Sequence, residues 1–390
     1  MLVCKAPEQN AGSTELRRKR TVIASNPRLA GFSDGTEDAC TNVMLRALAK
    51  TSVARAFTVS GADRWFRRED DAAVPFIAGY HRVVEDFVES ARGTIPSMLI
   101  SAATFERHLE WLARRYTLVS LDDIGLHLQQ GRRFGRPAAA VTFDDGYADV
   151  YHHAFPILRR KGIPAAVFVV TGLTGTSQPQ LYDRLFMCLS RKTLVTRVLQ
   201  RLGLPARAED PFQLLTLLLT RYPQERLAAI VSELEADHPP TRREIDALAP
   251  MTWRMIEEME REGITIGSHT SSHVLLTSET SEGVRSELAG SKQTLEAHLK
   301  KPVHHFAYPD GRCNPAIVDA VRKAGYRFAY TICRWRDSRE PLLTIPRKVL
   351  WERAASNAFG QFSGSIMNCH AHGFFDSRRS CEHDHGALAA

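Results

Sequence analysis

The stretch AAAVTFDDGY, residues 138–147, is an apolar run that ends in two adjacent carboxylates. A short, continuous apolar run is typical of a strand with both faces buried, and Gly146 predicts where that strand ends. Burying charge is costly unless a partner neutralises it. A helix N-cap would account for Asp144 or Asp145, but it would not account for both. We therefore interpret this stretch as the start of an active site and expect the rest of the chain to supply its partners.

Strand-like runs recur on both sides of this stretch, and most are followed by a helical pattern. The expected strands cover residues 74–83, 116–121, 138–143, 165–170, 264–267, 306–308, 328–332 and 343–350. About eight strands that alternate with helices favour a parallel α/β barrel, and an open doubly wound sheet is the alternative. Neither glycine-rich phosphate motif, GxGxxG after a strand or GxxxxGK[ST], occurs.

Composition divides the chain into four regions. Residues 1–40 are polar and have no hydrophobic period. We expect either a disordered segment or a start codon that was assigned too far upstream. Residues 41–73 read as a basic amphipathic helix and a linker; packing on the domain is the favoured role of this helix, and peripheral membrane contact is the lesser alternative. Residues 74–364 form the expected barrel, with a leucine-rich helical insertion at about 176–250. We expect residues 365–390, rich in His and Cys, to be a disordered tail, in which a second metal site is conceivable.

The bulk numbers exclude several classes of protein. The net charge is +7, but the basic residues are dispersed apart from a short cluster at 17–20, so we expect no nucleic-acid partner. Seven cysteines without a CxxC pair indicate no disulfide framework and favour a reducing compartment. No apolar run approaches the roughly 20 residues of a membrane span, and the N-terminus lacks a signal-peptide core. A cytoplasmic location is therefore the expectation, and the sequence does not indicate the oligomeric state.

Polar side chains of unusual type share one position in the predicted strands, the C-terminal end. They are His81, Asp144, Asp145, His269, His273 and residues 308–311. In a parallel barrel these strand ends converge on one face, where catalytic groups lie. If a helical turn begins at His269, then His273 shares its face, and Asp145 would complete a set of two histidines and one carboxylate that suits a divalent metal. Asp144 would then accept a proton from a metal-activated water. The HExxH pattern of zinc proteases is excluded, because the histidine pair has no intervening Glu.

Three of these stretches together resemble the signatures of the polysaccharide deacetylases, the NodB-homology domain or carbohydrate esterase family four. They are TFDDG at 142–146, HTxxH at 269–273 and FAYPDG at 306–311, in the family's order and spacing. The resemblance spans roughly residues 74–364. Residues 80–83, YHRV, are similar to a bacterial branch that includes biofilm exopolysaccharide deacetylases and that often has a helical insertion before the second signature.

The resemblance implies a distorted (β/α) barrel and removal of acetyl groups from N-acetylated sugars of a glycan, by attack of a metal-bound water on the acetamide. It implies that Asp144 is the general base and that Asp145, His269 and His273 hold the metal. The backbone N–H of Asp310 would stabilise the oxyanion, as a donor placed where charge develops. The family favours Zn²⁺, and the ligand set would also accept Co²⁺, Ni²⁺ or Fe²⁺.

The sequence also departs from the family. Asp310 replaces a frequent aromatic residue, within a substrate-facing turn that also comprises Tyr308, Pro309 and Gly311. The family's late Leu-x-x-His, which supplies the general acid, is not evident at 344–364. We therefore expect His81 to be the acid, because it ends a strand on the same face and histidine titrates near neutral pH.

Three alternatives stay open at this point. Arg347 either orients a nearby carboxylate or makes an ordinary barrel salt bridge. The enzyme could hydrolyse O-acetyl esters instead of acetamides on the same fold. The chain could also be a non-catalytic carbohydrate-binding protein with a decayed site, although the intact signature residues argue against decay.

Overall fold

The computed structural model describes residues 37–61, 75–132, 134–205, 210–332 and 336–375. The expected disordered segment 1–40, most of the linker and residues 376–390 therefore lie largely outside the described residues. The chain divides into two compact units, Met1–Ala47 and Leu48–Ala390. The described part of the first unit is the beginning of helix α2 (Glu37–Val59). All of the described strands lie in the second unit.

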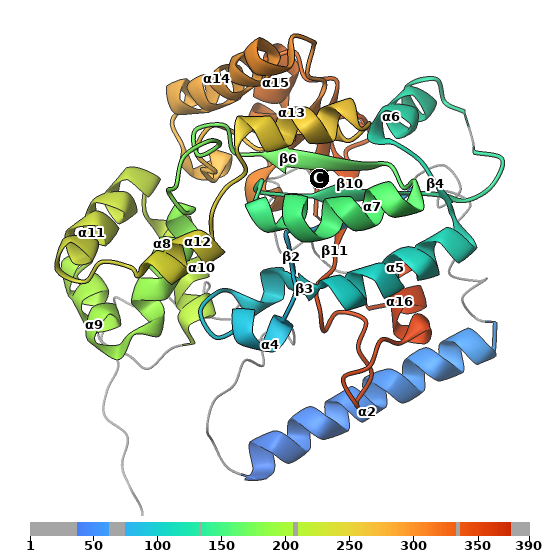
Figure 1. The fold of residues 1–390 in the computed structure, drawn as a ribbon, viewed down its shortest axis with the longest axis horizontal. Coiled ribbons are helices and arrows are strands. Elements are labelled where there is room, and N and C mark those ends of the chain that lie inside the picture. The colour runs from blue at the N-terminus through green and yellow to red at the C-terminus, as the bar shows by residue number, and fades with distance from the viewer. Residues whose placement is uncertain (1–36, 62–74, 133, 206–209, 333–335, 376–390) are drawn as a thin grey trace, which may run out of the picture. The chain divides into compact units, whose positions relative to one another are not determined.

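A parallel sheet forms the centre of this second unit, as predicted (Figure 1). Its strand pairing nearly closes it into a barrel. Its strand order is β10-β9-β8-β7-β6-β5-β1-β11, and β4 also pairs with β5. The strands are β1 (Phe76–Tyr80), β4 (Thr117–Leu118), β5 (Ala138–Phe143), β6 (Ala165–Val169), β7 (Thr265–Ser268), β8 (His305–Ala307), β9 (Phe328–Thr331), β10 (Ile345–Pro346) and β11 (Lys348–Val349). All of these pairs are parallel. A separate two-stranded sheet joins β2 (Arg82–Val84) to β3 (Leu99–Ser101).

One segment joins the two edges of the large sheet. β10 pairs with β9 and β11 pairs with β1, and Arg347 is the single residue between β10 and β11. The first and last strands are therefore neighbours, as a barrel requires and an open sheet does not. The predicted α/β barrel is confirmed over the open alternative.

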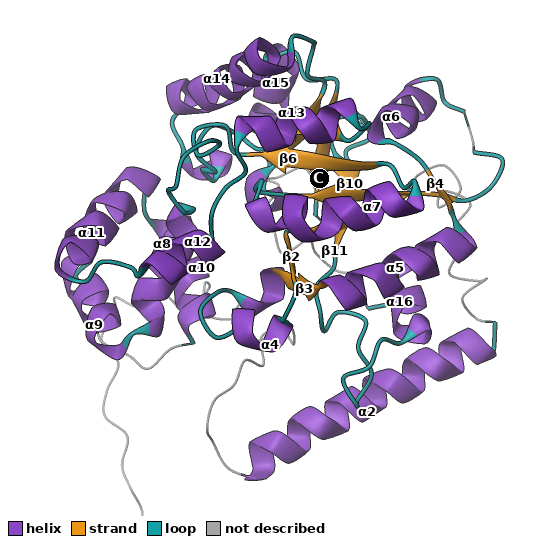
Figure 2. Ribbon diagram, viewed as in Figure 1, coloured by secondary structure: helices purple, strands orange, loops and turns teal. Residues whose placement is uncertain are grey.

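Helices surround the strands, as Figure 2 shows. They are α4 (Phe87–Ser90), η3 (Pro96–Met98), α5 (Ala102–Arg115), α6 (Leu121–Gln129), the π-helical η4 (Val150–Ala154), α7 (Phe155–Lys161), α13 (Trp253–Arg261), η5 (Leu276–Ser278), α14 (Ser281–Leu299) and α15 (Pro315–Lys323), and the short turn η6 (Pro309–Gly311) follows β8. The predicted N-cap Thr252 is confirmed, because its side chain accepts from the Met255 N–H. Gly162 ends α7 at φ 60°, the left-handed conformation that favours glycine.

The insertion is helical, as expected. It comprises α8 (Leu181–Ser190), α9 (Lys192–Arg201), α10 (Pro211–Arg221), α11 (Gln224–Asp237) and α12 (Arg242–Ala247). Leu214, Leu215 and Leu218 of its leucine-rich stretch are buried. They belong to a hydrophobic cluster distinct from the one that fills the barrel. This second cluster also takes in Ile95 and Tyr147, so the core of the insertion is continuous with residues outside it.

The expectation of a disordered tail from residue 365 is wrong for its first part. Helix α16 (Gly364–Ala371) is capped by the Ser363 side chain. Ile366, Met367 and Cys369 are buried within the main hydrophobic cluster, so burial of apolar surface orders a segment whose composition is otherwise polar. Within α2, Phe57 is buried and its ring centroid lies 4.4 Å from that of Phe374, which agrees with the packing role expected of this helix. In the part of the chain that the structure describes, no helix combines the length and apolar character needed to cross a membrane.

Candidate metal and catalytic centre

The two carboxylates after β5 diverge because the chain reverses there. Asp145 has φ 72° and Gly146 has φ 71°, both in the left-handed region. A Cβ at position 146 would lie 3.1 Å from the Val169 side chain, so the turn needs glycine. The backbone N–H of Asp144 still donates to the Tyr80 carbonyl at 2.9 Å. The turn thus gives each carboxylate its own surroundings.

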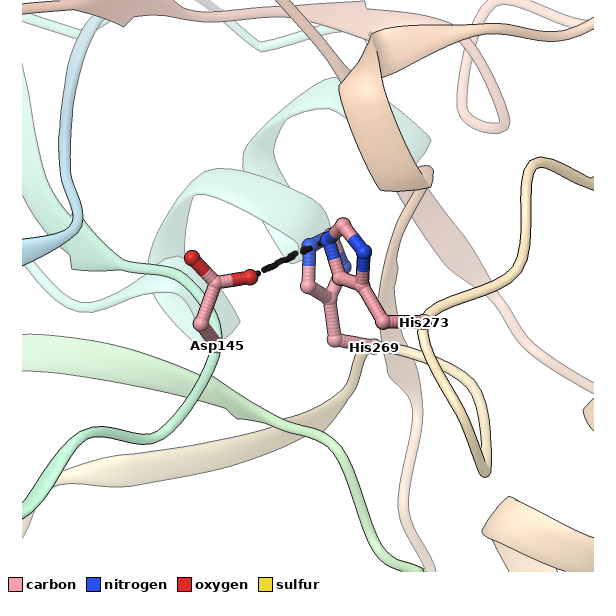
Figure 3. A group of neighbouring side chains, drawn as sticks. All are labelled: Asp145, His269 and His273. Carbon is pink, nitrogen blue, oxygen red and sulfur yellow. Dashed lines mark ion pairs between the residues drawn. The ribbon is translucent and has the colours of Figure 1, made fainter. Parts of the chain in front are cut away.

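Asp145 lies against both predicted histidines (Figure 3). Its Oδ1 is 3.1 Å from His273 Nε2 and 3.5 Å from His269 Nε2. One ligand atom from each of the three residues lies within 4.8 Å of the others, and among the described residues this is the group of His, Cys, Asp or Glu side chains identified as able to hold a metal.

The donor set suits a divalent cation. Asp145 is 3% exposed, and its carboxylate makes no well-aligned hydrogen bond among the described residues, although Oδ1 lies 3.1 Å from His273 Nε2. A buried carboxylate supported only by imidazole rings is unfavourable, and a cation bound by two imidazoles and this carboxylate would neutralise it. Burial alone would raise the pKa of Asp145, but His273, with smaller contributions from His81 and His269, holds that pKa well below its usual range.

The protonation of His269 is set by a backbone contact. Its Nδ1 lies 2.7 Å from the Ala307 carbonyl oxygen, which can only accept, so Nδ1 donates and Nε2 presents a lone pair toward Asp145. Burial lowers the pKa of His269 to about 4, so this ring is neutral at pH 7. For His273, burial lowers the pKa, but the contact with Asp145 outweighs burial and the net shift is upward.

The histidine pair does not lie on a helical turn, and that expectation is corrected. Residues 269–273 form a loop with left-handed φ at Thr270 and His273. The reason lies in α14, where the Glu287 carboxylate accepts from the N–H groups of Ser271 at 2.8 Å and Ser272 at 2.9 Å. Those N–H groups point to a side chain rather than into a helical ladder. The loop still brings both rings to Asp145.

Asp144 forms a buried ion pair with Arg347. The two guanidinium nitrogens donate to Asp144 Oδ1 at 2.7 Å and Oδ2 at 2.8 Å, and the Arg347 side chain is fully buried. Arg347 also donates to Thr142 Oγ1 at 3.1 Å, and its guanidinium lies 5.1 Å from the centroid of the Phe168 ring. Burial is the largest influence and raises the pKa of Asp144, but the charge and hydrogen bonds of Arg347, together with the nearby His269 and His81, outweigh it, so the pKa is lowered. Of the two roles left open for Arg347, the geometry favours orienting this carboxylate.

His81 lies between β1 and β2, half-buried, with an Nδ1 that is buried and has no hydrogen-bond partner among the described residues. It is near enough to both carboxylates to contribute, after burial and the larger partners, to the pKa of Asp144 and of Asp145. Tyr80 and Phe143 are partners in the parallel β1–β5 pair, so His81 leaves the same end of the sheet as Asp144.

The turn of the third signature has two kinds of residue. Tyr308 is fully buried: its hydroxyl donates to the Leu343 carbonyl at 2.9 Å, and its N–H donates to the Tyr330 carbonyl at 3.1 Å. Tyr308 therefore supports the turn rather than offering a donor to substrate. Pro309 and Gly311 are buried, whereas the side chain of Asp310 is 42% exposed, with φ 53° and an ion pair to Arg312 at 2.6 Å. Asp310 thus lies at the rim of the site.

Sequence reasoning missed several residues that contact this centre. Gln180 and Tyr182, at the start of the insertion, contact Asp145 and His273, and Glu287 fixes the histidine loop. One signal in the sequence could have indicated Gln180 and Tyr182. They are a polar and an aromatic residue at the start of an otherwise leucine-rich insertion.

Comparison with known proteins gives consistent findings. The family model described as polysaccharide deacetylase matches residues 131–200 and 222–329. YxkH of Bacillus subtilis, whose name assigns it provisionally to the polysaccharide deacetylases, is 22% identical over 304 residues, covering 77% of this chain and 80% of that protein. The poly-beta-1,6-N-acetyl-D-glucosamine N-deacetylase of Staphylococcus aureus (strain MSSA476) is 29% identical over 104 residues, which is 25% of this chain and 36% of that protein. The solved deacetylase PplD of Streptococcus pyogenes gives a TM-score of 0.49 at 18% identity, covering 74% of this chain and 96% of that one.

Proposed function

Because the chain belongs to the polysaccharide deacetylase family, we propose that it is a metal-dependent hydrolase that removes acetyl groups from N-acetylated sugars of a polysaccharide or glycan. One observation carries this proposal: the group Asp145, His269 and His273, of which the first two are buried, lies beside a separately ion-paired Asp144. The name of the Staphylococcus aureus relative supports an N-acetylated glycan as the substrate class.

In this proposal Asp145, His269 and His273 hold a divalent cation, with Zn²⁺ favoured and Co²⁺, Ni²⁺ or Fe²⁺ compatible. Such a cation supplies Lewis-acid chemistry and lowers the pKa of a water from 15.7 toward about 7. Asp145 and neutral His269 present their lone pairs to it. The Ala307 carbonyl keeps the His269 ring in the tautomer that ligation requires.

Asp144 acts as the general base. The Arg347 pair keeps its carboxylate ionised and oriented, and each carboxylate oxygen retains a second lone pair that can accept a proton. His81 acts as the general acid and protonates the leaving amine; this role is supported by its position directly after β1, at the sheet end from which Asp144 and Asp145 follow β5. The backbone N–H of Asp310 stabilises the oxyanion, in a turn that Tyr308 and Gly311 support.

Acetate release tests the proposal. The purified protein, stripped of metal and then supplied with Zn²⁺ or Co²⁺, is assayed on β-1,6-linked N-acetylglucosamine oligomers, chitooligosaccharides and O-acetylated xylo-oligosaccharides. We expect metal-dependent acetate release from an N-acetylated substrate. Release from the O-acetylated substrate alone would assign an esterase instead, and no release with any metal would refute the hydrolase.

Two variants test the residue roles. His269→Ala should lower the metal content found by elemental analysis, whereas His238→Ala, at an exposed position in the insertion, should not. Equal low metal content in wild type and His269→Ala would overturn the metal site. His81→Ala should retain the metal but lose most of kcat, and full activity in that variant would refute its role as the acid.

A further inference from the structure

We infer that the helical insertion is part of the catalytic centre, where it positions both of the loops that carry the metal ligands. The inference rests on the proposed function, because ligand position matters to a site that binds a metal. The insertion joins β6 to β7, so its two ends begin and finish close to the strands that carry the site. Its contacts with the site are hydrogen bonds to the backbone and one contact between rings.

The turn that carries Asp145 is held by both ends of the insertion. At the beginning, Gln180 is 3% exposed and its Nε2 donates to the Asp145 carbonyl at 3.3 Å. At the end, the Met251 N–H donates to the Gly146 carbonyl at 2.8 Å, and the Ala148 N–H donates to the Ala249 carbonyl at 2.9 Å. A left-handed φ at a non-glycine residue such as Asp145 costs about 1–2 kcal/mol, so it persists where surrounding contacts fix it.

The loop that carries the histidines is held by the same insertion. Gln224, the first residue of α11, donates from Nε2 to the Ser272 carbonyl at 2.7 Å. The Tyr182 ring lies 5.0 Å from the His273 ring, centroid to centroid. One side of the ligand His273 therefore packs on the insertion, while the backbone just before it is fixed by a glutamine from another insertion helix.

A buried polar network connects the two attachments. Tyr147, two residues beyond Asp145, donates from its hydroxyl to Asp183 Oδ2 at 2.5 Å, and the same hydroxyl contacts the Tyr182 hydroxyl. All three side chains are buried. Tyr147 belongs to the turn that carries Asp145, and its hydroxyl contacts Tyr182, whose ring packs on His273. The positions of the two ligand loops therefore depend on each other.

Two features distinguish positioning from simple packing. The hydrophobic cluster that fills the insertion also includes Ile95 and Tyr147 from outside it but neither glutamine, so the glutamine contacts are separate from the apolar packing. Those contacts also end on the backbone of the ligand loops rather than on scattered surface groups. Removing a group that supports a metal ligand typically lowers the affinity for the metal 10- to 100-fold.

The two test variants are Gln180→Met, which keeps the buried volume, and Gln224→Ala. The control variant is Gln200→Ala, which changes an exposed glutamine on α9 of the same insertion. The full-length protein is stripped of metal. Its Kd for Zn²⁺ and Co²⁺ is then measured by competition with a chromophoric chelator, the visible spectrum of bound Co²⁺ is recorded, and the Tm of the metal-free protein is measured.

We expect each test variant to bind both metals about 10- to 100-fold more weakly, with an altered Co²⁺ spectrum and a metal-free Tm close to that of wild type. Gln200→Ala should match wild type throughout. Kd values within twofold of wild type and an unchanged spectrum would overturn the inference and leave the proposed function intact. A loss of affinity that merely follows a fall in the metal-free Tm would also overturn it. Failure of wild type to bind either metal would instead refute the proposed function.

Discussion

The buried pair Asp144–Arg347 allows a sharp prediction about stability. Arg347→Met keeps an unbranched side chain but removes the charge that faces Asp144 at 2.7 and 2.8 Å. Both side chains are at most 3% exposed, so water cannot replace the lost partner. Breaking a buried pair from one side typically costs about 3–5 kcal/mol, because the other charge is left unpaired. We expect the free energy of unfolding to fall by that amount at pH 7.

The assay is urea unfolding of the metal-free protein, arranged as a double-mutant cycle with Asp144→Asn. The doubly substituted protein carries no unpaired charge, so it should be more stable than Arg347→Met alone. Arg242→Met, which removes the exposed partner of Asp246, is the control and should show no measurable change. A cost for Arg347→Met below about 1 kcal/mol, or a double variant whose loss equals the sum of the single losses, would refute the reasoning.

Three further predictions concern other residues. Burial lowers the pKa of His108 to about 3, whereas the pKa of a histidine in an unfolded chain is roughly 6.5. Between these two values the unfolded state binds more protons than the folded state, so the free energy of unfolding falls as the pH drops. About 2 kcal/mol should be lost between pH 7 and pH 5. Urea unfolding at pH 7 and pH 5 should show a smaller loss in His108→Phe. Gly311→Ala places a Cβ 2.4 Å from the Ile332 side chain at a residue with φ 63°. Gly131 has nearly the same φ, 62°, but open space around it, so Gly131→Ala is the matched control. Thermal unfolding should show a larger fall in Tm for Gly311→Ala than for Gly131→Ala. Glu287→Ala releases the loop at 270–272 and should weaken Co²⁺ binding, with the exposed Glu282→Ala unchanged; equal affinities would contradict that role.

Much of the fold was predictable from the chain because central strands such as β5 and β6 are short, largely apolar runs. The run at 138–143 gives β5 with the expected bounds, and Thr252 and Gly162 mark helix ends through side-chain and backbone chemistry that acts over a few residues. Such local signals survive in sequence, since they do not depend on distant partners. The meeting of Asp145 with two histidines followed from the position of each at a strand end.

The features that could not be predicted depend on distant residues. The loop at 269–273 is shaped by Glu287, whose carboxylate replaces the helical ladder that the spacing of the two histidines suggested. Helix α16 forms where its apolar side chains meet the main cluster, although its surroundings in sequence are polar. Gln180 and Gln224 carry no motif, and their contacts become apparent once the insertion is folded against the site.

The closing segment of the barrel has a consequence for the order of assembly. Arg347 lies between the two short strands that join the ends of the sheet, and it reaches a carboxylate 203 positions earlier in the chain. During synthesis from the N-terminus, Asp144 emerges long before its partner, so a nascent chain must tolerate an unpaired carboxylate until the last strand arrives. The same short segment supplies the partner of Asp144 and pairs with both edges of the sheet. Chains truncated before residue 345 should therefore lack both the ion pair and the closed sheet.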